Sequence, residues 1–154
     1  MFMSRQVVAR VRPQNAMEME RSGSLAVKLT DTNVIVTMPD EGSMPFTLDR
    51  VFDMDSTQVE VFEDTTLPLI ADVLSGYNAT VFAYGQTSSG KTHTMEGSDI
   101  HDRDSRGIVP RALESLFSGV EQAEDSVEFS FKVTYVEIYM VRTYHCLSKR
   151  SFSA

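Results

Sequence analysis

A glycine-rich run from Gly85 to Thr92 limits what this chain can fold into more than any other feature of its sequence. The run fits the pattern G-x-x-x-x-G-K-[ST]. Gly85 and Gly90 let the backbone bend tightly and approach phosphate oxygens without an intervening Cβ, and the N–H groups of the loop and of the following helix attract anions. In this pattern the lysine, here Lys91, reaches the β- and γ-phosphates, and the Thr92 hydroxyl coordinates Mg²⁺. The run therefore predicts a site for a purine nucleotide triphosphate.

The segment before this run supports the same interpretation. Residues 79–84 are nearly all apolar, as expected of a short strand that is buried on both faces of a parallel sheet. A strand, a glycine-rich loop and a helix, in that order, are the setting in which the motif binds phosphate. A chance match with a purely structural role is the alternative, and this setting disfavours it.

The first third of the chain is rich in predicted strands, and a helix follows it. This helix is expected to begin at Thr57, which has capping-box spacing with Glu60. Pro68 should kink the helix because it lacks a backbone donor, and Gly76 should end it. Apolar or alternating patterns predict the strands at residues 7–11, 25–29, 34–37 and 46–52.

The second half of the chain is expected to alternate between loop, helix and strand. Residues 97–107 are polar and predict a surface loop, after which Pro110 indicates the first turn of a helix. Residues 127–135 alternate as in a half-buried strand, and the apolar phase shifts at Val136. Residues 141–154 show neither period and are expected to be disordered.

Composition narrows the class of protein but not its function. The chain has 154 residues, of which 42% are apolar and 23% charged, as in an ordinary soluble domain. Its 14 basic and 22 acidic residues give a net charge of −8, so we expect no nucleic-acid partner. The single Cys146 fits a reducing compartment. The sequence shows no secretory signal and no apolar run of spanning length, so we expect the cell interior and no membrane span.

Several motifs together make the chain resemble the kinesin motor domains. The loop residues Thr87-Ser88-Ser89 and the run from His93 to Gly97 (H-T-M-E-G) separate kinesins from other phosphate-loop proteins. The resemblance covers residues 5–140. Its other blocks are R-x-R-P at Arg10–Pro13, F-x-F-D-x-V-F at Phe46–Phe52 with Leu48 in place of an aromatic residue, and the matches at Gly107–Arg111 and Val133–Tyr139.

The resemblance implies an α/β fold of the kinesin type of P-loop NTPase. Such a fold has a mixed, mainly parallel central sheet with helices on both faces, here truncated after the strand ending near Tyr139. The implied function is the ATP-binding portion of a kinesin-like microtubule motor, whose intact form couples ATP hydrolysis to movement. The implied cofactors are ATP and Mg²⁺, the partners are ATP or ADP and microtubules, and the location is the cytoplasmic microtubule cytoskeleton.

The same resemblance assigns the site residues. Arg10 and Pro13 should flank the adenine, with His93 on its other side. For Arg12 two roles stay open, nucleotide binding and a structural role. For Glu137 two roles stay open: a function within its motif block, or simple exposure to solvent at a strand edge. The residues predicted to bind ATP are Arg10, Pro13, Gly85, Gln86, Thr87, Ser88, Ser89, Gly90, Lys91, Thr92 and His93, and Thr92 is also the predicted Mg²⁺ ligand.

Two family motifs that serve hydrolysis do not occur in the sequence. They are the switch motifs N-x-x-S-S-R-S-H and D-L-A-G-S-E, so no complete catalytic set is expected. We expect residues 1–140 to be a partial motor domain and residues 141–154 a non-homologous tail. Truncation, alternative splicing or a reading-frame error would each explain that change. Because the family's later strands insert between the earlier ones, we also expect the chain alone to be loosely folded at best.

Two other functions stay open. One is a non-catalytic, truncated fragment that binds nucleotide weakly or not at all. The other is a different phosphate-loop enzyme such as a small-molecule kinase, which R-x-R-P together with H-T-M-E-G disfavours.

Replacement of Lys91 by alanine tests the nucleotide site itself. We expect Lys91→Ala to abolish nucleotide binding, because a charge-assisted contact worth about 1.5–3 kcal/mol is lost. Titration with a fluorescent ATP analogue measures the effect. Undiminished binding by the variant would contradict the assignment.

Overall fold

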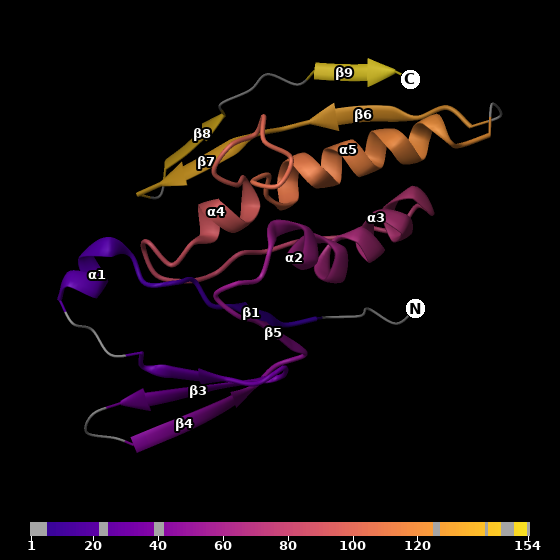
Figure 1. The fold of residues 1–154 in the computed structure, drawn as a ribbon. Helices are drawn as coiled ribbons and strands as arrows, with labels where there is room; N and C mark the ends of the chain where they lie inside the picture. The colour runs from indigo at the N-terminus through magenta and orange to yellow at the C-terminus, as the bar shows by residue number, and fades with distance from the viewer. Residues whose placement is uncertain are drawn as a thin grey trace. The chain divides into compact units, whose positions relative to one another are not determined.

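The computed structural model describes residues 6–21, 25–38, 42–124, 127–140, 142–145 and 150–153. It divides into two compact units, residues 1–113 and residues 114–154 (Figure 1). Every residue of the predicted nucleotide site belongs to the first unit, so that unit is the one that matters for function.

In the described part of the first unit, the strands form two small sheets. β1 (Val8–Arg10) pairs in parallel with β5 (Arg50–Phe52), and Arg10 lies opposite Phe52. An antiparallel sheet has the order β2-β3-β4 and contains Val27–Leu29, Asn33–Met38 and Gly42–Thr47. These strands confirm three of the predicted segments, residues 7–11, 25–29 and 34–37.

The fourth predicted strand, residues 46–52, is divided between the two sheets. β4 ends at Thr47, and β5 begins at Arg50. Between them the Leu48 N–H donates to the Thr32 carbonyl, and the Asp49 N–H donates to the Val7 carbonyl. The backbone therefore changes hydrogen-bonding partners from one sheet to the other at this point, which a one-dimensional pattern does not reveal.

The predicted long helix is two helices, α2 (Gln58–Thr65) and α3 (Leu67–Leu74). The capping box is confirmed: the Thr57 hydroxyl accepts from the Glu60 N–H at 3.2 Å, and the Thr57 N–H donates to the Glu60 carboxylate at 2.7 Å. Pro68 lies in the first turn of α3, where its missing N–H loses no helical hydrogen bond. Gly76 follows the end of α3 with φ +91°, as its predicted role requires.

The glycine-rich loop leads into α4 (Lys91–Met95), and α5 (Ile108–Glu121) follows after a loop. That loop is the predicted surface loop, and a bridge between Gly97 and Arg106 closes its base. Gly97 has φ +92°, and a Cβ there would collide with the Ser105 carbonyl oxygen. Only glycine fits both the positive φ and this close approach of two backbone segments.

The predicted buried strand at residues 79–84 is wrong. In the structure this segment has no strand hydrogen bonding, and its large side chains are exposed. Phe82 is 81% exposed and Tyr84 90% exposed, and their ring centroids lie 6.4 Å apart. A strand of this kind needs hydrogen-bonding neighbours at both edges and packing on both faces, and no described segment pairs with it.

In the second unit, α5 ends and is followed, among the residues that the structure describes, by four short strands. Their bounds are β6 (Ser130–Val133), β7 (Val136–Tyr139), β8 (Arg142–His145) and β9 (Arg150–Ser153). β6 pairs with β9 and β7 with β8, both antiparallel. Phe117 of α5 packs on Phe131 of β6, with ring centroids 4.9 Å apart.

The C-terminal residues differ from the predicted disorder. β8 and β9 lie within residues 141–154, where the sequence shows no strand periodicity. A ladder is built from backbone groups that every sequence supplies, so strands can form there without an alternating pattern. The proposed domain boundary at residue 140 stays a prediction.

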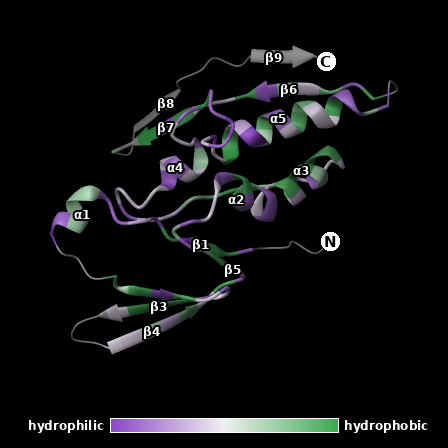
Figure 2. Cartoon of the chain, viewed as in Figure 1, coloured by the Kyte–Doolittle hydropathy of each residue, from purple (hydrophilic) through white to green (hydrophobic). Residues whose placement is uncertain are grey.

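The hydrophobic core of the first unit is small. Phe52, Val61 and Ile108 form its buried cluster, and Val8 and Met95 pack against it. Hydrophobic residues are prominent along β1 and α3 (Figure 2). Because the clustered residues come from β1, β5, α2, α4 and α5, the cluster joins the elements that surround the predicted site. In the part of the chain described by the structure, no helix has both the length and the apolarity to cross a bilayer.

Exposed apolar side chains predict how the isolated chain unfolds. Phe82, Tyr84 and Ile138 are among the large hydrophobic residues that solvent reaches, while few of the described hydrophobic residues are buried. We expect the 154-residue chain to unfold over a broad temperature range and to bind a hydrophobic dye such as ANS. Circular dichroism and dye fluorescence measure these properties. A sharp cooperative transition without dye binding would contradict the expectation.

Candidate nucleotide-binding site

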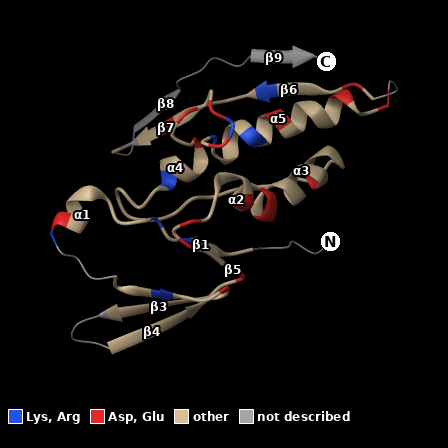
Figure 3. Cartoon of the chain, in the orientation of Figure 1, with Lys and Arg blue, Asp and Glu red and all other residues tan. Residues whose placement is uncertain are grey.

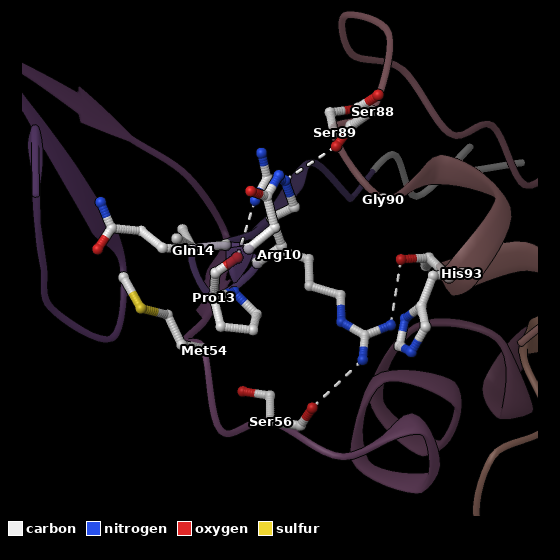
Figure 4. Close-up of a pocket in the computed structure, with 13 residues that line it drawn as sticks. Arg10, Pro13, Gln14, Met54, Ser56, Ser88, Ser89, Gly90 and His93 are labelled. Carbon is white, nitrogen blue, oxygen red and sulfur yellow. Dashed lines mark hydrogen bonds between the residues drawn. The ribbon is translucent and has the colours of Figure 1, made fainter. Parts of the chain in front are cut away.

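A pocket of about 540 Å³ joins the two motifs that the sequence assigns to nucleotide binding (Figure 4). The segment after β1 supplies one wall, the chain before α2 another, and the end of the glycine-rich loop with α4 a third. The residues that line it are Arg10, Val11, Arg12, Pro13, Gln14, Asn15, Met54, Ser56, Ser88, Ser89, Gly90, His93 and Thr94.

The structure therefore brings together six of the predicted site residues. They are Arg10, Pro13, Ser88, Ser89, Gly90 and His93. The other five belong to the same loop and the first turn of α4 but do not line this pocket: Gly85, Gln86, Thr87, Lys91 and Thr92.

The loop turns sharply at two residues with positive φ. Ser88 has φ +64°, and Gly90, which caps α4, has φ +99°. A side chain at Gly90 would be strained by this φ, which is the conformational reason for the second glycine of the motif. At Gly85 the constraint is different, because a Cβ there would collide with the Ser89 hydroxyl oxygen. Both glycines of the motif are therefore required by the backbone conformation of the loop.

Lys91 and Thr92 begin α4 directly after the loop, and Figure 3 shows a basic residue in this helix. The Lys91 ammonium donates to the carbonyls of Gly85 at 2.9 Å and Gln86 at 2.8 Å. Since an ammonium has three donors, these contacts leave one for a phosphate oxygen. The ammonium and the exposed Thr92 hydroxyl fit a nucleotide phosphate with its Mg²⁺. No group of three His, Cys, Asp or Glu side chains gathers as a metal cluster within the described residues.

Arg10 carries a positive charge into the pocket wall. It donates to the Gln58 amide oxygen at 2.7 Å, the Thr94 hydroxyl at 3.1 Å and the Ser56 carbonyl at 3.3 Å. Its burial lowers the pKa of the guanidinium, which nevertheless stays protonated near pH 7. All three acceptors are neutral, so these contacts orient the guanidinium without cancelling its charge.

His93 stands beside this guanidinium in Figure 4. The pKa of its imidazole is lowered from 6.5, first because the pocket partly desolvates the ring and second because the charge of Arg10 repels a proton. A neutral ring is consequently favoured near pH 7. Such a flat, uncharged ring suits contact with an aromatic base.

Arg12 contacts a carboxylate and thus differs from Arg10. Its guanidinium donates to both oxygens of Glu18, at 2.7 and 2.5 Å, and its Nε donates to the Ser88 carbonyl at 2.9 Å. The hydrogen bonds from Arg12, followed by the one from the Asn15 backbone, lower the pKa of Glu18 to about 2. The sequence left the role of Arg12 open, and this geometry favours a structural one, in which Arg12 braces the loop at its strained Ser88.

Sequence reasoning missed several residues of this site. Asn15 and Glu18 form a capping box on α1 (Ala16–Glu20), and their spacing in the sequence could have revealed it. Gln58 and Thr94 hold Arg10, but no local pattern marks them. Their contact with Arg10 depends on segments far apart in the chain.

Comparison with known proteins decides the family. The family model for the kinesin motor domain matches residues 10–153. The chain belongs to the kinesin motor domain family. It is 43% identical over 136 residues to a kinesin heavy chain from Neurospora crassa, covering 88% of this chain and 15% of that protein. It is 42% identical over 134 residues to the human kinesin-1 heavy chain, covering 87% of this chain and 13% of that protein.

A solved structure of a fast kinesin has the same fold. That structure is described in terms of its implications for ATPase mechanism and interactions with microtubules. The TM-score is 0.84 at 42% identity, and the match covers 91% of this chain and 40% of the solved chain. The expected kinesin-type P-loop α/β fold is therefore confirmed. This kinesin chain spans about one seventh of the length of the two heavy chains.

Titration of His93 tests the electrostatics of the pocket. We expect NMR to give a pKa below 6.5, and Arg10→Gln to raise it by removing the repelling charge. Because the folded pKa is below the unfolded one, His93 contributes stability above pH 6.5 that is lost as the pH falls through the folded pKa. Arg21→Gln, which removes an exposed arginine outside the pocket, is the control. A His93 pKa at or above 6.5 in the unsubstituted chain would contradict this account.

Proposed function

We propose that this chain is the nucleotide-binding portion of a kinesin-like microtubule motor and that it binds ATP or ADP with Mg²⁺. The observation that carries the proposal is the pocket in which Arg10, Pro13 and His93 meet the end of the glycine-rich loop. One wall comes from the R-x-R-P motif and another from the phosphate-loop motif, and a nucleotide has a base and a phosphate chain to occupy both.

Each part of the site has a separate task in this proposal. The guanidinium of Arg10, the ring of Pro13 and the imidazole of His93 hold the adenine. Lys91 and the loop N–H groups bind the phosphates, and the Thr92 hydroxyl is a ligand of Mg²⁺, which neutralises charge on the phosphate oxygens. Gly90 and the brace of Arg12 on Ser88 keep the loop in its curved path.

The activity of the whole motor is a further part of the proposal. The similar solved kinesin is described as an ATPase that interacts with microtubules, and on that basis we propose that the intact protein couples ATP hydrolysis to movement along microtubules in the cytoplasm. Hydrolysis needs a group that orients the attacking water and a second anchor for Mg²⁺. The switch motifs that provide them in kinesins do not occur in these 154 residues. We therefore propose that these residues bind nucleotide without turning it over.

A fragment with little or no nucleotide affinity is the second candidate. The exposure of Phe82 and Tyr84, directly before the loop, favours it. A loop that is not anchored by a buried strand loses conformational entropy when it orders around phosphates, and that loss weakens binding.

A combined binding and turnover assay distinguishes these candidates. We expect calorimetry to detect MgATP binding by the 154-residue chain, and phosphate release to stay at background with or without microtubules. Omission of Mg²⁺ is the control for a metal-dependent nucleotide site. Absence of binding would favour the second candidate. Microtubule-stimulated phosphate release would show that the missing switch motifs are not needed.

A further inference from the structure

Gln58 is a buried polar residue at the start of α2, with 6% of its surface exposed. Nothing in the resemblance to kinesins assigned it a role. Its position is fixed by the capping box of Thr57 and Glu60, which defines the first turn of the helix. A buried amide must satisfy its hydrogen bonds, so its partners show what its burial achieves.

The two ends of the Gln58 amide contact the two residues predicted to hold the base. Its oxygen accepts from the Arg10 guanidinium at 2.7 Å, and its nitrogen donates to the His93 carbonyl at 2.7 Å. A longer contact of 3.4 Å runs from the nitrogen to the Ser105 carbonyl in the surface loop. A single side chain thus connects β1, α2 and α4 where they border the pocket.

The contact with Arg10 is the shortest of the three that this guanidinium makes. An arginine side chain has high rotamer entropy, so it adopts one geometry only when several acceptors hold it. The guanidinium has five N–H donors, and three contacts leave others for a ligand. A neutral acceptor such as an amide oxygen orients the charge while leaving it available to the pocket. A carboxylate, as found at Arg12, would pair with it instead.

We propose that Gln58 is a positioning residue, which aligns Arg10 and His93 for contact with the nucleobase and so supports the preference for ATP over a triphosphate without a base. This inference rests on the proposed nucleotide-binding function. Gln58 lies next to Arg10 and His93 rather than at the phosphate loop, so its effect is specific to the base. Binding of the phosphate chain through Lys91 does not depend on it.

Two probes distinguish the contribution of the base to binding from that of the phosphates. They are MgATP and Mg-tripolyphosphate, and the affinity of each variant for both is measured. We expect Gln58→Leu to weaken ATP binding roughly tenfold and to leave tripolyphosphate binding unchanged. Gln58→Glu still accepts from Arg10 but pairs with its charge, and it cannot donate to the His93 carbonyl, so it should also lower the ATP preference. Gln122→Leu, which replaces an exposed glutamine on the other unit, is the matched control.

A double substitution tests whether Gln58 acts through Arg10. We expect the loss of ATP preference in Arg10→Ala with Gln58→Leu to be smaller than the sum of the two single losses, because one of the two groups that Gln58 positions is already absent. Partial unfolding reduces both affinities equally and leaves their ratio intact, so the ratio reports positioning rather than fold. Equal losses for both probes in Gln58→Leu, or additive losses in the double variant, would overturn the role of Gln58. Failure of the unsubstituted chain to bind either probe would instead overturn the proposed function.

Discussion

The parallel pairing of β1 with β5 is the interaction on which the candidate site depends. Its register puts Arg10 opposite Phe52, so the two strands end at the same edge. The carboxyl ends of parallel strands are where α/β proteins bind ligands, because both chains leave the sheet there as loops. One loop carries the R-x-R-P motif, and the other leads through Ser56 into Gln58. The burial of Phe52 against Val61 and Ile108 holds this pairing in place.

The two arginines of the R-x-R-P motif show how environment assigns different tasks to the same side chain. Arg12 is bidentate to Glu18 and donates to Ser88, so its charge is neutralised and its geometry supports the loop. Arg10 donates to neutral oxygens, and its charge adds to the desolvation that lowers the pKa of His93 nearby. A guanidinium that is oriented but not neutralised can bind a ligand, whereas one that is paired with a carboxylate mainly supports the structure around it.

In the segment before the phosphate loop, the local sequence pattern and the tertiary structure disagree. Residues 79–84 have the composition of a buried strand, yet Phe82 and Tyr84 are exposed. Hydrophobicity alone does not make a strand, since the backbone groups of a strand must pair with neighbours. The reverse holds for β8 and β9, which form ladders without apolar alternation.

The sequence by itself determined the phosphate loop, the capping box of Thr57 and Glu60, and the family. The phosphate loop and the capping box depend on residues close together in the chain, Gly85 to Thr92 and Thr57 with Glu60. Their conformations are set by neighbouring residues. Tertiary structure decided the division of residues 46–52 between two sheets, the exposure of residues 79–84 and the place of Gln58 between Arg10 and His93. These features depend on pairings between distant segments, and the free energy of such contacts is set by burial and geometry that exist only once the chain has folded.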